Sequence, residues 1–111
     1  MKTLETMTKD ERSQLLFFES CAVDNAGRVK IAHMNELDMQ IAERWDADGF
    51  VGFGRVADQS LRESRTMGSH FCILSEEAWR LAAEERKARA ARLWAKRTWK
   101  TTAEADGEGD E

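Results

Sequence analysis

The sequence predicts an α+β fold in which three helices accompany a small antiparallel sheet with a long hairpin loop. Helix-capping residues occur at Thr8, Asn35 and Ser75, and each precedes apolar residues at helical spacing. Short β-prone runs lie between these helix signals, at residues 28–31, 50–56 and 70–74. A chain of 111 residues can bury one modest core, so we expect a single domain.

The first helix is predicted to begin after Thr8, because Thr8 and Glu11 have the spacing of a capping box. Turn-forming residues 24–27 end it. Its apolar face is broad and consists of Leu15, Leu16, Phe17, Phe18 and Ala22. Such a face is typical of a helix packed at the centre of a domain.

The second helix is predicted at residues 36–48, with Asn35 as its N-cap. Its apolar stripe consists of Leu37, Ile41 and Trp45. Gly49 can adopt the left-handed conformation that ends a helix, and Phe50 is placed to fold back over the last turn.

Two strands with a loop between them follow, at residues 50–56 and 70–74. Val51 and Phe53 alternate onto one face of the first strand. In the second strand Phe71 and Ile73 are the more apolar pair, so we expect their face to be the core side. The segment 57–69 is too long for a tight turn and is predicted to be the wing of a hairpin.

The third helix is predicted to begin after Ser75 and to run to about Trp99. We expect Trp45 and Trp79 in the core, because an indole buries a large apolar area. Trp94 and Trp99 lie where the apolar stripe thins to alanine, and we expect them to contact a partner. The acidic segment 103–111 has no apolar anchor and is predicted to be a disordered tail, which leaves residues 1–102 as the domain.

Charge is segregated along the chain. Residues 1–79 carry 9 basic and 14 acidic side chains, a net charge of −5. Residues 80–102 carry 8 basic and 2 acidic side chains, a net charge of +6, and residues 103–111 carry 5 acidic ones, a net charge of −5. The formal net charge of −4 therefore says little about any local surface.

The basic third helix is the strongest candidate for a binding surface. Guanidinium groups pair with phosphates, and indoles can stack on unpaired bases. The candidate residues on this helix are Arg86, Arg89, Arg92, Trp94, Lys96, Arg97, Trp99 and Lys100, and a second basic patch near the wing consists of Arg55, Arg62 and Arg65. Two other interpretations stay open: a solvated helix face, or a surface for an acidic protein.

No pattern in the sequence indicates catalysis, a cofactor or a metal. There is no glycine-rich phosphate loop and no nucleophile motif. Cys21, Cys72, His33 and His70 do not form the close ligand pairs of a structural zinc site. We expect both cysteines to be buried, reduced thiols, as in a cytosolic protein.

The string "GFVGFGRV…HFCILSEEAWRLA" resembles the segment of MarR-like and PadR-like winged-helix regulators in which a helix ends at a glycine, a wing hairpin follows, and a capped C-terminal helix begins. The resemblance covers roughly residues 10–95. It implies a winged-helix-like fold that binds duplex DNA, with one helix in the major groove and the wing along the backbone.

Two functions remain after this comparison. The first is a non-enzymatic cytoplasmic regulator that forms a homodimer and binds nucleic acid through the basic helix and the wing. The second is a protein-binding adaptor or inhibitor, of the kind encoded by phages and mobile elements, on a winged-helix scaffold that has lost DNA recognition. The chain has no apolar run of the roughly 20 residues that a membrane span needs, so we expect no membrane partner.

Overall fold

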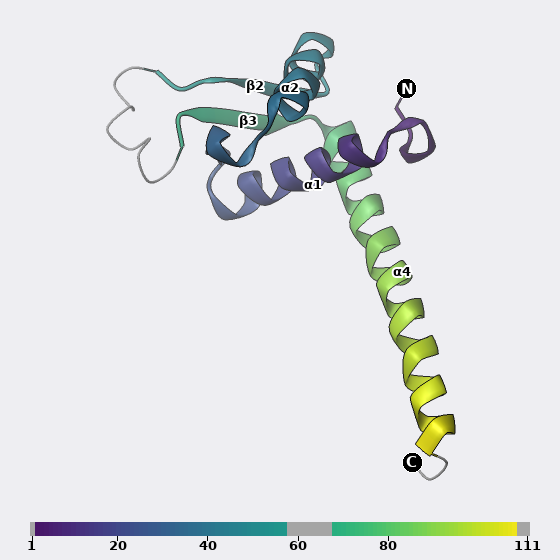
Figure 1. Cartoon of the computed structure of the whole chain (residues 1–111). Helices are drawn as coiled ribbons and strands as arrows, with labels where there is room; N and C mark the ends of the chain where they lie inside the picture. Colours follow the sequence, from purple (N-terminus) through teal and green to yellow (C-terminus); the bar gives the residue numbers. More distant parts are fainter. Residues whose placement is uncertain (1, 58–67, 109–111) are drawn as a thin grey trace.

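The computed structural model describes residues 2–57 and 68–108, and side chains as far as Arg97. The predicted α+β class is confirmed: within these described residues three α-helices accompany a three-stranded antiparallel sheet (Figure 1). The elements in chain order are η1 (Leu4–Thr6), α1 (Lys9–Asp24), β1 (Arg28–Val29), η2 (Ile31–His33), α2 (Glu36–Asp48), β2 (Val51–Arg55), β3 (His70–Leu74) and α4 (Glu76–Glu108).

The sheet has the strand order β1-β3-β2, so the hairpin strand β3 lies in the middle. Val51 pairs with Leu74, Phe53 with Cys72, and Arg55 with His70. This arrangement is compatible with a small winged-helix-like domain. Most of the predicted wing, residues 58–67, lies outside the described residues.

The predicted helix caps are confirmed. The Thr8 hydroxyl accepts from the amide of Glu11 at 3.1 Å, and the Glu11 carboxylate accepts from the amide of Thr8 at 2.8 Å. Asn35 caps α2, and Gly49 ends it with φ of +80° in the left-handed region. Each helix therefore begins where the chain supplies its unpaired amides with an acceptor.

The core lies between α1, α2 and one face of the sheet. Phe18 of α1 and Trp45 of α2 meet with ring centroids 6.3 Å apart, and Phe50 folds back onto Trp45 at 5.1 Å, as predicted. The prediction for Leu37 is wrong, because its side chain is 45% exposed. Leu37 is in the first turn of α2, whereas the buried stripe consists of Ile41, Ala42 and Trp45.

The predicted core side of β3 is also wrong. Cys72 and Leu74 face the core, whereas Ile73 is 65% exposed. The register decides this, because it places Cys72 opposite Phe53, on the face covered by α1. On the outer face the Phe71 ring lies over Gly54, where an added Cβ would come within 3.0 Å of the ring.

The buried stripe of α4 differs from the predicted one. Trp79 is 39% exposed, and the buried positions are Ala78, Leu81, Ala82 and Glu85, which recur at helical spacing. The packing against α1 requires small side chains at this crossing, which the alanines provide. Indole size alone was therefore a poor guide to burial.

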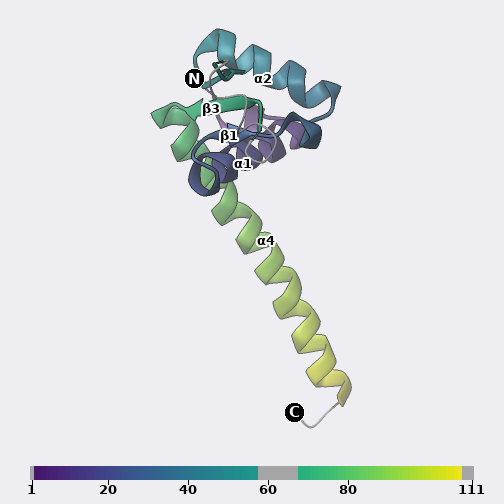
Figure 2. The same cartoon turned by 90° about the vertical axis from the view of Figure 1, so that its left-hand side faces the viewer.

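Beyond this crossing α4 projects from the domain as a long rod, which gives the molecule extents of 64 × 34 × 24 Å (Figures 1 and 2). The helix continues to Glu108, past the predicted end near Trp99, and includes part of the segment predicted to be disordered. Alanine and long charged side chains dominate it, and both favour helix propagation. None of the helices in the described ranges is long and apolar enough to cross a membrane.

Candidate nucleic-acid interface

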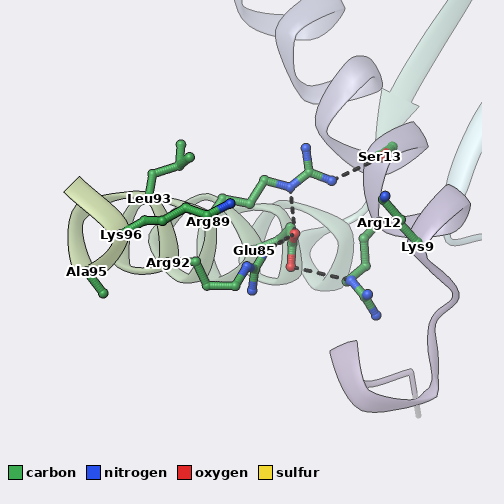
Figure 3. Close-up of a pocket in the computed structure, with 9 residues that line it drawn as sticks. All are labelled: Lys9, Arg12, Ser13, Glu85, Arg89, Arg92, Leu93, Ala95 and Lys96. Carbon is green, nitrogen blue, oxygen red and sulfur yellow. Dashed lines mark hydrogen bonds and ion pairs between the residues drawn. The ribbon is translucent and has the colours of Figure 1, made fainter. Parts of the chain in front are cut away.

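A groove of about 970 Å³ lies where the first turns of α1 approach the middle of α4 (Figure 3). Of the described side chains that line it, five are basic and one is acidic, which gives them a formal charge of +4. The lining residues are Lys9, Arg12, Ser13, Glu85, Arg89, Arg92, Leu93, Ala95 and Lys96. We call this feature the basic groove.

Helical periodicity brings these side chains to one place. Lys9, Arg12 and Ser13 are three and four residues apart, so they share one side of α1. The groove side of α4 carries side chains at intervals of four, three and four residues, namely Glu85, Arg89, Arg92 and Lys96. The α1 capping box fixes where α1 starts, and hence where its basic side chains lie.

Glu85 is the centre of the basic groove, and it is only 1% exposed. Arg89 donates from Nε to its Oε2 at 2.7 Å, and Arg92 from Nη2 to the same oxygen at 3.2 Å. Arg12 Nε lies 3.8 Å from Oε1. Burial alone would raise the pKa of Glu85, but the hydrogen bonds and charges of Arg89 and Arg92 outweigh it and lower the pKa below its ordinary value.

Further hydrogen bonds fix two of these arginines. Arg12 donates from Nη1 to the carbonyl of Met7 at 2.6 Å, and Arg89 donates from Nη2 to the Ser13 hydroxyl at 3.0 Å. Each guanidinium has five N–H donors, so both keep donors for a ligand. Guanidiniums held in this way lose little side-chain entropy when an anion binds.

Lys9 and Lys96 supply charge that no acid balances. Within the described part of the chain, no acidic group lies within 4.0 Å of either ammonium. Figure 3 shows Lys96 lying along α4 toward Arg89, with Lys9 across the groove on α1. The excess positive charge is therefore exposed at the groove surface.

The structure separates the predicted site residues into groups. Arg89, Arg92 and Lys96 line the basic groove. Arg86 does not, because its Nε donates to Glu19 at 2.8 Å. Trp94 and Arg97 are exposed on α4 outside the groove lining. Arg62 and Arg65 lie outside the described residues, as do the side chains of Trp99 and Lys100.

Arg55 lies at the end of β2, and Figure 1 places that end on the side of the sheet away from α4. Its neighbour His70 stacks on Phe53 with ring centroids 5.3 Å apart. Burial and the charge of Arg55 lower the pKa of His70, so the imidazole is neutral at pH 7. The described part of the hairpin and the basic groove are therefore two separate surfaces.

Sequence reasoning missed Lys9, Arg12, Ser13 and Glu85. The signal for Glu85 was present, because it continues the spacing of Ala78, Leu81 and Ala82 onto the buried side of α4. A carboxylate at such a position needs cationic partners. Nothing in the sequence places the first turns of α1 beside α4, since that contact depends on tertiary packing.

The groove offers an anion several guanidinium and ammonium donors. The Ser13 hydroxyl accepts from Arg89, and the one carboxylate among the described lining residues, Glu85, accepts from Arg89 and Arg92. No cluster of three or more metal-ligating side chains occurs in the described residues. Cys21 and Cys72 are buried side by side, and their hydrogen bond and burial raise the pKa of Cys72, so that thiol is neutral.

Comparisons of the chain with protein-family models, curated proteins and solved structures find no match. The function is therefore inferred from the basic groove itself.

Proposed function

We propose that this chain is a non-enzymatic regulatory protein that binds nucleic acid through the basic groove. The observation that carries the proposal is the convergence of five cations from α1 and α4 around one buried carboxylate. A fixed excess of guanidinium and ammonium groups matches the closely spaced phosphates of a polyanion. The winged-helix resemblance, with its expectation of DNA as the target, is part of the same proposal.

The groove favours contacts to the sugar-phosphate backbone over readout of bases. None of the described side chains that line it is aromatic, asparagine or glutamine, so among them there is no ring for base stacking and no amide for adenine. Arginine can read guanine, but Arg89 and Arg92 already donate to Glu85. Backbone contacts position a protein on nucleic acid but carry little sequence information. We therefore infer binding with weak sequence preference at this surface.

α2 does not suit insertion into the major groove. It carries Glu36, Asp38, Glu43, Asp46 and Asp48, and its single arginine, Arg44, pairs with Glu11. Its acids would face phosphates and be repelled. The role of α2 is therefore to support the fold and not to contact DNA bases.

The alternative, a protein-binding adaptor that uses the acidic surface, has less support. Asp38 accepts from the amide of Asn35, Asp46 from that of Phe53, and Asp48 from that of Phe50. These carboxylates cap the start of α2 and the amides around β2. Fewer acids than the sequence suggests are thus available for a basic partner.

The test is a titration of labelled duplex DNA, single-stranded DNA and RNA, read by fluorescence anisotropy at two salt concentrations. Five phosphate contacts would weaken duplex binding by on the order of a few hundredfold between about 50 and about 200 mM salt. Lys9→Glu and Lys96→Glu should each weaken binding several-fold. Lys30→Glu is the matched control, because it makes the same charge change at an exposed residue outside the groove.

Two results would contradict the proposal. Equal losses in all three variants would show that binding follows net charge and not the groove. An absence of binding to every polyanion at low salt would favour the adaptor.

A further inference from the structure

An exposed apolar stripe runs along the side of α4 that faces away from the basic groove. Successive residues of an α-helix are about 100° apart, so Trp79, Ala83, Ala90 and Trp94 fall within a sector of about 60°. Trp79 is 39% exposed and Trp94 is 70% exposed. An indole exposed to this degree on a rod that leaves the domain is typical of a binding face (Figure 2).

The positions of these four residues are symmetric about one point of the helix. The midpoint of Trp79 and Trp94 lies between Arg86 and Lys87, and the midpoint of Ala83 and Ala90 is the same. If two copies of α4 were antiparallel, with a twofold axis at this point, each tryptophan would face the other tryptophan of the second copy. Each alanine would likewise face an alanine, which lets the two helices approach closely.

The charges along α4 favour this antiparallel arrangement. Apart from the residues that line the basic groove, residues 76–86 carry three acidic and two basic side chains, whereas residues 87–97 carry two basic and no acidic ones. An antiparallel pair puts the acidic half of each copy beside the basic half of the other, whereas a parallel pair would put like charges together.

Individual residues on the stripe follow the same symmetry. Glu76 and Arg97 lie on this side of the helix at equal distances from the midpoint, so they would face each other twice in the pair. Two cations flank the axis, Arg86 and Lys87. Arg86 is already neutralised by Glu19 of its own chain at 2.8 Å, which leaves Lys87 as the cation that meets its own copy at the centre.

We propose that α4 is a self-association surface through which two copies of the chain pair antiparallel over residues 76–97. The pairing buries Trp79 and Trp94 against one another around a close alanine contact, with Glu76 and Arg97 paired at both ends. The overlap is 22 residues, or about 33 Å of helix. The basic groove lies on the other side of α4 and stays open, so the pairing does not depend on nucleic-acid binding.

The first test measures the molar mass of the full chain in a concentration series by analytical ultracentrifugation, without nucleic acid. We expect a dimer that dissociates on dilution, and Trp94→Ala should weaken the association about tenfold or more. Because Trp94 is largely exposed, this variant should keep the wild-type circular dichroism spectrum. A chain that stays monomeric at every concentration would overturn the proposal.

A charge swap tests the antiparallel register. Glu76→Arg and Arg97→Glu should each weaken the dimer several-fold, and the double variant should recover most of the loss, because the pair is restored with its signs exchanged. The double variant keeps the unfavourable Arg at the start of α4, so recovery cannot come from helix stability. A double variant no better than the single ones would exclude this register.

Discussion

Glu85 sets the charge balance of the basic groove. Its carboxylate is buried and is within ion-pair distance of Arg12, Arg89 and Arg92. We expect Glu85→Gln to lower the free energy of unfolding at pH 7 by about 1–3 kcal/mol, because it removes charged hydrogen bonds and leaves three cations close together. Denaturant melts measure this loss. Glu84→Gln is the control and should cost less than ~1 kcal/mol, since the Glu84 pair with Arg80 is exposed.

The same substitution should strengthen polyanion binding, because it raises the groove charge by one unit. We expect a few-fold gain for duplex DNA at about 50 mM salt, shrinking as salt screens the groove. Fluorescence anisotropy on the folded variant measures it. Weaker binding by Glu85→Gln would mean that the carboxylate is needed to hold the arginines in a binding geometry.

The pH dependence of stability follows from the direction of the Glu85 shift. Its pKa is lowered in the folded chain, so the stability it contributes is complete above the ordinary glutamate pKa of about 4.3 and is lost as the pH falls through the lower folded value. The difference in stability between the wild type and Glu85→Gln should therefore be constant near neutrality and shrink in acid. Urea melts over a pH series test this, and a difference that grows in acid would contradict the assignment.

At the scale of elements, Gly49 ends α2 and begins the turn into β2. With φ of +80° and no atom within 4 Å of an added Cβ, the cost of a side chain there is purely conformational. We expect Gly49→Ala to destabilise the chain by about 1–2 kcal/mol in denaturant melts. Gly52→Ala is the matched control: its φ is not positive and its Cβ would make an ordinary contact of 3.6 Å with Ile73. Equal effects of the two would contradict this explanation.

At the scale of the whole molecule, we expect the negative charge of the acidic C-terminal segment to oppose polyanion binding. Residues 103–111 carry five acids, and in the helical arrangement Glu104 follows Lys96 by eight residues, or about 12 Å. That separation is close to the Debye length at ~0.1 M salt. Deleting residues 103–111 should therefore raise polyanion affinity a few-fold at about 50 mM salt and hardly at all at high salt. An unchanged affinity at low salt would show that this segment does not act on the groove.

The sequence by itself determined the element order and most element ends. These depend on short-range chemistry: the Thr8 and Asn35 caps each serve an amide three residues later, and the left-handed Gly49 requires only its own backbone freedom. It also located Arg89, Arg92 and Lys96 as binding candidates, because charge density along a helix can be read directly from the order of residues.

Only the tertiary structure decided which faces are buried and which cations act together. Cys72, rather than Ile73, faces the core because strand register places it against α1. Glu85 and Arg12 are 73 positions apart, and α1 packing on α4 makes them neighbours. Apolar character along one segment does not say which of two faces another segment will cover, and that information is carried by contacts between residues distant in the sequence.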